Sequence, residues 1–183
     1  MSTTAVTPFA PGTYTADPVH SSFGFAVKHI VSTFRSSFGD VSATLVADEN
    51  GEVKIEGAAK AESIAIVQPE QFRAHVLSPE FFDAANYPEI TFSSTNVAFD
   101  ADGTARVEGK LTIKDNTVDV VATGTYTEPV EGLTGAAVGA IELETTVDKN
   151  AVGLTWNAPL PKGGNVLADE VTLNIHVEFV AQA

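Results

Sequence analysis

The residues best suited to metal binding or acid–base chemistry are four histidines, His20, His29, His75 and His176. Their spacings match no dense ligand motif, and the chain contains no cysteine. A metal site needs three or four converging ligands with supporting contacts behind them. We therefore expect no metal site and no metal cofactor, and we expect His20 and His29 to form hydrogen bonds near the ends of the fold.

Hydrolytic chemistry is the next possibility. Ser21 and Ser22 adjoin His20, but the chain has no Gly-x-Ser-x-Gly elbow and no acid placed to orient the base. The strand pattern directs neighbouring Asp169 and Glu170 to opposite faces, and Glu142 and Glu144 share a solvated face. Paired carboxylates need a common cleft to act on a glycoside. We therefore predict no catalytic residues and a protein that is not an enzyme.

The elements that carry these residues are mostly β-strands, because apolar and polar residues alternate with a period of two. The final strand is the clearest, and its apolar face is formed by Val171, Leu173, Ile175, Val177 and Phe179. Asn50-Gly51 predicts a hairpin turn, and a break in the alternation within residues 93–96 predicts a β-bulge.

One segment interrupts this pattern with helical signals, and we predict one or two short helices around residues 69–86. Ser78 is expected to cap a helix whose first residue is Pro79, with Glu80 at the positive end of the helix dipole. Pro88 is expected to end it. The aromatic residues of this segment predict a lid or floor for an apolar cavity.

Length and charge limit the other function classes. The chain has 183 residues and a net charge of −14, which argues against electrostatic binding of nucleic acid or of an anionic membrane. We expect a flexible arm over residues 1–12 and one domain over residues 13–183. The N-terminus lacks the features of a secretory signal, so we expect a cytoplasmic protein, or a periplasmic or secreted one if a signal preceded this sequence. No stretch has transmembrane length.

About eight strands joined by short turns predict an antiparallel meander. Closure into a barrel removes the open edges that favour aggregation, so we predict an all-β, antiparallel eight-stranded barrel, with a sandwich as the second choice. Such a barrel can be filled by its own side chains or hold one small ligand.

Four motifs, in order along the chain, resemble the YceI-like family. Residues 17–29 (DPVHSSFGFAVKH) are similar to its first strand, and residues 75–92, centred on SPEFFD and YPEITF, to its helix and following strand. Residues 108–113 (EGKLTI) and 167–171 (LADEV) resemble its hairpin and final strand. The similarity runs from about residue 13 to residue 180. The chain departs from the family pattern at Phe72-Arg73 and at Lys149, where the family has Arg-Asp and arginine.

The resemblance implies a lipocalin-like barrel with an elongated apolar cavity that binds a polyisoprenoid lipid or isoprenoid quinone, and it implies that a homodimer is common. We accordingly predict a non-catalytic carrier or store of a long isoprenoid, with the head group near Lys28, Arg73 or His75. The predicted ligand-binding residues are Phe23, Phe25, Val27, His29, Phe34, Phe38, Phe72, Arg73, His75, Phe81, Phe82, Tyr87, Phe92, Gly109, Leu111 and Trp156. The alternatives are a ligand-free barrel that acts through protein contacts and, less favoured, a small hydrolase or isomerase.

Overall fold

A computed structural model describes residues 4–183 of the protein as one antiparallel sheet with two short helices. The strands are β1 (Ala5–Val6), β2 (Gly12–Ala16), β3 (Ser22–His29), β4 (Ser32–Phe38), β5 (Val41–Ala47), β6 (Val53–Lys60), β7 (Glu89–Asp100), β8 (Thr104–Ile113), β9 (Asn116–Glu131), β10 (Ala137–Asp148) and β11 (Leu167–Ala181). A 3-10 helix, η1 (Ala61–Ser63), and an α-helix, α1 (Glu70–Leu77), lie between β6 and β7.

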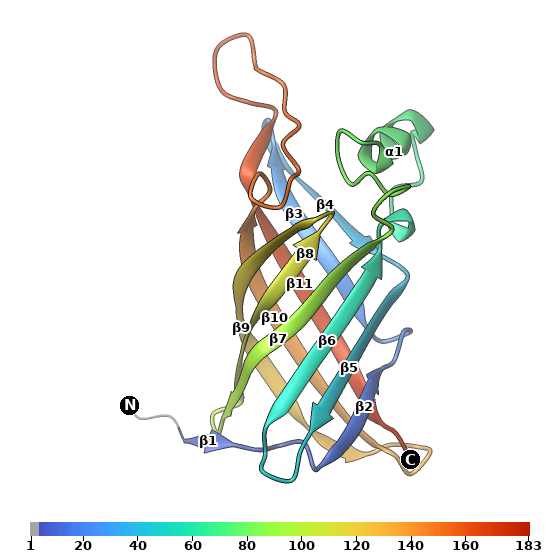
Figure 1. Ribbon diagram of the computed structural model, residues 1–183, viewed down its shortest axis with the longest axis vertical. Coiled ribbons are helices and arrows are strands. Elements are labelled where there is room, and N and C mark those ends of the chain that lie inside the picture. The colour runs from blue at the N-terminus through green and yellow to red at the C-terminus, as the bar shows by residue number, and fades with distance from the viewer. Residues whose placement is uncertain (1–3) are drawn as a thin grey trace.

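The sheet closes on itself because β10 pairs with β11 as well as with β9. β2 and β3 both pair with β11, at opposite ends of that long strand, and they act as one interrupted stave. β4 and β5 form a second interrupted stave beside them. With β6 to β11 this makes a closed eight-stranded antiparallel barrel (Figure 1), which confirms the predicted fold class.

The alternation of residue types explains the wall of this barrel. In β8, buried and exposed residues alternate almost without interruption, as expected for a strand with one face on a core. The predicted bulge is present, because the pairing of β7 with β8 shifts between Ser94 and Asn96. The turn at Asn50-Gly51 is also present, and Gly51 has a φ of +83°, which glycine adopts at little cost.

The helix differs in its position from the prediction. It begins after Pro69 and ends at Ser78, so Ser78 caps the C-terminus of a helix and not the N-terminus. The hydroxyl of Ser78 donates to the carbonyl oxygen of His75 at 2.7 Å. Pro79 drives Ser78 into an extended conformation (φ −72°, ψ 168°), which stops the helix. No helix within residues 4–183 is long and apolar enough to cross a bilayer.

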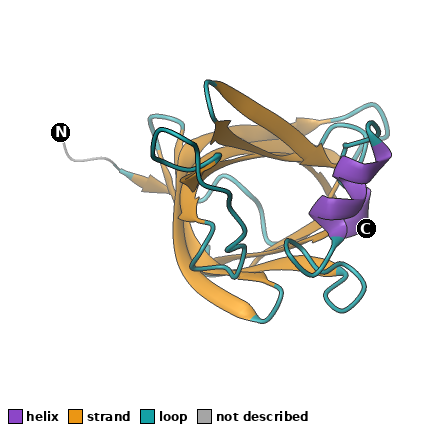
Figure 2. Ribbon diagram, turned by 90° about the horizontal axis from the view of Figure 1, so that it is seen from above, coloured by secondary structure: helices purple, strands orange, loops and turns teal. Residues whose placement is uncertain are grey.

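The two ends of the barrel differ. The open end carries α1, the β3–β4 turn and the loop of residues 149–166, and Figure 2 shows α1 over one side of the ring of strands. The closed end carries the β5–β6, β7–β8 and β9–β10 turns (Figure 1).

The expected flexible arm of residues 1–12 differs from what the structure shows of it. Residues 1–3 lie outside the described part of the chain, while β1 pairs with β7 through Ala5 and Val6. Phe9 is 2% exposed and packs at the closed end against Tyr14, Phe99 and Phe179. The segment is ordered because this aromatic ring is buried in the barrel core.

Candidate functional site

The barrel encloses an elongated cavity of about 680 Å³. Its walls are formed by the inward faces of β3 to β11 together with α1 and the segments that follow α1 and β10. Aliphatic and aromatic side chains dominate the lining, and Lys149 is the only Lys, Arg, Asp or Glu among the described residues that line it. A close-packed interior leaves few voids larger than a water molecule, so a cavity of this size is space for a ligand.

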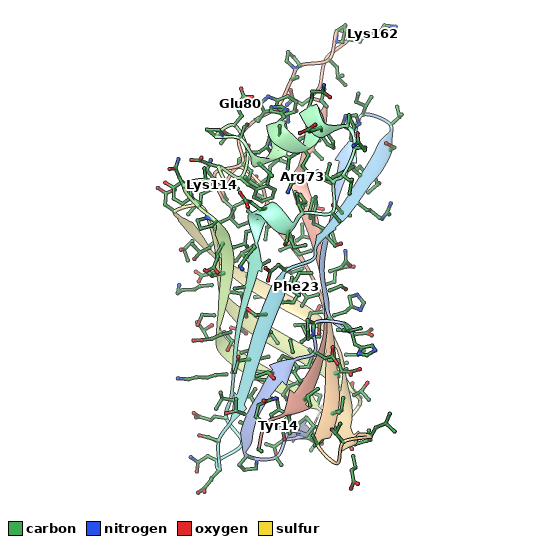
Figure 3. All side chains as sticks on the ribbon, turned by 90° about the vertical axis from the view of Figure 1, so that its right-hand side faces the viewer. Tyr14, Phe23, Arg73, Glu80, Lys114 and Lys162 are labelled. Carbon is green, nitrogen blue, oxygen red and sulfur yellow. The ribbon has the colours of Figure 1, made fainter. Side chains whose placement is uncertain are left out.

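The closed end forms the floor. Phe179 and Ile141 line the deepest part of the cavity, and both are almost fully buried. Behind them lies a packed cluster that includes Phe9, Tyr14 and Phe99, and Figure 3 places Tyr14 far from the open end. The ring of Phe9 meets those of Tyr14 and Phe179 edge to face, with centroids 5.3 and 6.4 Å apart. The cavity is therefore blind at this end.

At the open end, three rings from three segments meet over the cavity. His75 of α1 contacts Trp156 of the 149–166 loop, with centroids 5.0 Å apart, and Phe81 at 5.2 Å. The imidazole Nε2 of His75 lies 2.8 Å from the Glu80 carboxylate, which fixes the orientation of the ring. His75, Phe81 and Trp156 form what we call the mouth cluster. Because each ring is only partly buried, the cavity reaches solvent here.

A second group of aromatic residues fixes α1 and the turn after it to strands β3 and β4. Phe72 of α1 packs edge to face on Phe34 of β4, and Phe82 packs the same way on Phe38. Phe25 of β3 contacts both Phe34 and Phe38, at 6.1 and 5.9 Å between centroids. Burial of this aromatic surface holds the helical segment over the cavity.

Lys149 is the buried cation of the wall, with 3% of its surface exposed. Its ammonium donates to the carbonyl oxygens of Leu154 and Trp156, at 3.1 and 3.2 Å, and to Oδ1 of Asn150 at 3.3 Å. An ammonium has three N–H donors, so these acceptors use all of them. Lys149 therefore anchors the loop that carries Trp156 and leaves no donor for a ligand.

The structure brings most of the predicted ligand-binding residues together. Those that line the cavity are Phe23, Phe25, Val27, His29, Phe34, Phe38, Phe72, His75, Phe81, Phe82, Phe92, Leu111 and Trp156. Arg73, Tyr87 and Gly109 are not among the lining residues. Arg73 points its guanidinium at the carbonyl oxygen of Glu62, and Tyr87 is half-buried in the turn before β7.

Gly109 stands behind another lining residue. A Cβ atom at this position would collide with the ring of Phe92 and with the backbone oxygen of Ser93. Phe92 therefore occupies the space that the missing side chain leaves, and it is Phe92 that faces the cavity. By contrast, the small residues Ala43 and Gly57 line the cavity directly.

Several lining residues were not predicted as site residues. Lys149, Val152 and Leu154 belong to the segment after β10, and Ile66 and Val76 to the segment around α1. No residue pattern shows that these connections fold inward over a barrel. The apolar face of β11 gave a usable signal, because all five of its predicted residues, from Val171 to Phe179, line the cavity.

The remaining histidines lie on the outside of the barrel. Nδ1 of His20 is 3.2 Å from Asp17 and 3.7 Å from Glu178, and the hydrogen bond that the imidazole donates to Asp17 raises the pKa of His20 and lowers that of Asp17. His176 lies 3.6 Å from Glu142 on the neighbouring strand. These groups are solvent-exposed and separate from the cavity.

Residues 14–179 match the family model described as YceI-like domain. The chain belongs to the YceI-like family. A UPF0312 protein of Staphylococcus aureus strain USA300 is 28% identical over 172 residues, which cover 91% of this chain and 96% of that protein.

Solved structures share the fold of this YceI-like barrel. Burkholderia cenocepacia BcnA superposes with a TM-score of 0.74 at 21% identity, over 89% of this chain and 98% of that one. The YCEI protein of Campylobacter jejuni gives a TM-score of 0.70 at 22% identity, over 85% and 90%. A polyisoprenoid binding domain from Saccharophagus degradans, implicated in plant cell wall breakdown, gives 0.63 at 14% identity, over 92% and 98%.

Proposed function

We propose that this protein is a non-catalytic carrier or store of a long isoprenoid lipid, a polyprenol or an isoprenoid quinone, whose tail lies along the barrel axis. The observation that carries the proposal is the blind, apolar cavity of about 680 Å³ that opens beneath the mouth cluster. A structural neighbour described as a polyisoprenoid binding domain supports the choice of ligand class.

Burial of the tail supplies the affinity. Each methylene removed from water contributes about 0.8 kcal/mol, so a long tail needs no polar contact along the barrel to be held. A tail that comes from a bilayer leaves one apolar environment for another, since lipid tails are as apolar as leucine. Transfer between bilayer and cavity is therefore nearly balanced in free energy, as a reversible carrier requires.

The charges around the cavity favour a neutral head group. Lys149 is the only Lys or Arg of residues 4–183 in the lining, and its three donors are engaged by Asn150, Leu154 and Trp156. The guanidinium of Arg73 donates to the carbonyl oxygen of Glu62, and Lys28 of β3 does not line the cavity. An anionic pyrophosphate would find no free buried cation here, so a quinone or an alcohol fits the mouth better.

Organic extraction of the purified protein, followed by mass spectrometry, tests the proposal. We expect a co-purifying isoprenoid, or, if the purified protein is empty, stoichiometric binding of an added polyprenol or quinone in detergent solution. Failure of both overturns the proposal and favours a ligand-free barrel. Turnover of a bound isoprenoid into a new product would overturn the non-catalytic part.

A homodimer is a compatible second proposal, favoured by the outer edge of β4. Within residues 4–183, the backbone of β4 pairs with β3, and on its other edge it forms a β-bridge only between Phe38 and Ile64. The edge from Ser32 to Ser36 is therefore open to strand addition by a second copy. Sedimentation analysis tests this: a monomer at every concentration overturns the dimer and leaves the carrier proposal intact.

A further inference from the structure

Two neighbouring segments project from the open end beyond the barrel wall. One is the β3–β4 hairpin with its turn at Ile30 and Val31, and the other is the loop of residues 149–166 (Figure 1). They touch where the Ile30 amide donates to the carbonyl oxygen of Val166 at 2.9 Å and where His29 pairs with Leu167. The two segments thus form one surface beside the mouth.

The turn of the β3–β4 hairpin carries two apolar residues, Ile30 and Val31, although exposed hairpin turns usually carry polar residues or glycine. Val31 is 96% exposed and Ile30 is 54% exposed. Ile30 also has a φ of +50°, a left-handed conformation that β-branched residues strongly disfavour and that Asn or Gly adopts readily in hairpin turns. Neither residue lines the cavity. Two costly apolar residues at an exposed tip point to a partner that covers them.

The charge of these segments is opposite to that of the protein. The whole chain carries a net charge of −14, yet residues 18–39 and residues 149–168 contain no Asp or Glu. Besides the buried Lys149, they carry Lys28, Arg35 and Lys162, and none of these three forms an ion pair within residues 4–183. Figure 3 places Lys162 at the far tip of the open end.

Acidic residues lie at both ends of the barrel, and at the open end η1, α1 and the turn after α1 carry Glu62, Glu70, Glu80 and Asp83. The β5–β6 turn contains Asp48, Glu49 and Glu52, and the β7–β8 turn contains Asp100 and Asp102. The hairpin and the 149–166 loop therefore differ in charge from the rest of both ends. A negatively charged surface would repel the acidic turns and attract these two segments, and this brings the side of the mouth next to them toward that surface.

We propose that Ile30 and Val31, with Lys28, Arg35 and Lys162, form a docking tip that binds the surface of an anionic lipid bilayer. This inference rests on the proposed carrier function, since a long isoprenoid is found in bilayers and the tip sits beside the opening through which the tail enters. Apolar residues enter the interface and the cations meet anionic head groups, as in other peripheral membrane proteins. The clustering of these cations overrides the expectation from net charge that the protein avoids such membranes.

Vesicle flotation tests the docking tip in the full-length protein without any isoprenoid present. The vesicles contain phosphatidylcholine with phosphatidylglycerol, and phosphatidylcholine alone serves as the neutral comparison. We expect binding to the anionic vesicles that weakens at high salt. Each cation near an anionic surface is worth about fivefold in affinity, so Lys28→Gln/Arg35→Gln should bind roughly 25-fold more weakly. Val31→Asp should also lose binding.

Matched controls sit at or near the closed end. Leu133 is fully exposed in the β9–β10 turn, so Leu133→Asp makes the same kind of change as Val31→Asp away from the mouth. Lys54→Gln/Arg106→Gln removes the same charge as the basic double variant. Both controls should float like the native protein. Equal loss in the controls, or no loss in the tip variants, overturns the docking tip and favours non-specific adsorption or a protein partner.

Failure of docking and failure of the carrier function give different results. A protein that binds polyprenol in detergent but never floats with anionic vesicles overturns the docking tip alone. A protein that floats with anionic vesicles but binds no isoprenoid overturns the carrier function. Membrane binding by the docking tip would then stand, but its role in isoprenoid uptake would not. Val31→Asp should keep polyprenol binding in detergent, because Val31 is outside the cavity, and lose uptake from vesicles.

Discussion

The ring of Phe81 lies 5.2 Å from that of Trp156, centroid to centroid, and this contact joins the turn after α1 to the loop before β11 across the mouth of the cavity. His75 contacts both rings. Each aromatic pair contributes about 0.5–1.5 kcal/mol beyond its buried area. The contacts of the mouth cluster therefore hold the two segments together over the cavity but can be broken by thermal motion. Ligand exchange should depend on it.

Trp156→Ala should speed the release of a bound isoprenoid roughly tenfold, because it removes two ring contacts from the closure. Stopped-flow transfer of a fluorescent polyprenol to acceptor vesicles measures the rate. Phe99→Leu is the control, since Phe99 packs on Phe9 and Tyr126 outside the cavity. It should lower stability and leave release unchanged. An unchanged rate in Trp156→Ala would show that the mouth opens elsewhere.

Ala43→Leu should shorten the longest tail that the protein accepts. Ala43 lines the cavity and is 6% exposed, so the larger side chain extends into the space for the ligand. Ala26→Leu is the matched control, because Ala26 does not line the cavity. Mass spectrometry of bound polyprenols of mixed length measures the effect. If both variants retain the same longest tail, the tail does not pass Ala43.

Lys149→Met should destabilise the protein by about 1–3 kcal/mol, because the carbonyl groups of Leu154 and Trp156 lose a buried donor. Urea denaturation measures the free energy of unfolding, and hydrogen exchange should show the greatest loss of protection over residues 150–156. Lys54→Met should be close to neutral. Full stability of Lys149→Met would contradict the anchoring role.

The pKa of His20 should lie above its ordinary value of 6.5, because Asp17 accepts a hydrogen bond from the imidazole. The raised pKa means that the stabilisation from His20 is complete below its unfolded pKa and disappears as pH rises through the folded value. The lowered pKa of Asp17 means that its share disappears as pH falls. The pair therefore stabilises the fold between the two titrations. NMR titration of the imidazole in native protein and in Asp17→Asn checks this, and equal values would exclude the interaction.

The barrel could be predicted because its determinants are local. β11 shows its inward face as Val171, Leu173 and Ile175 in every second position, and Asn50-Gly51 shows a turn on its own. These signals depend only on neighbouring residues, and the hydrophobic effect then selects the buried face.

The mouth could not be predicted in the same way. Ser78 before Pro79 is compatible with either end of a helix, and only the carbonyl oxygen of His75, which accepts its hydroxyl, decides between them. Trp156 and Phe81 come from distant segments, and no pattern in either one shows that they meet. Lys149 carries no sign in the sequence of the three acceptors that surround it.

Phe9 comes from the chain that precedes the first stave, yet it packs behind the floor of the cavity against Phe179. The floor of the cavity, formed by strand residues, is thus supported from behind by a segment that is separate from the barrel wall. Changes in this N-terminal segment could lengthen or shorten the compartment without altering any strand register. In this way the length of the cavity of a YceI-like barrel can change to fit longer or shorter ligands while the circumference of the barrel stays the same.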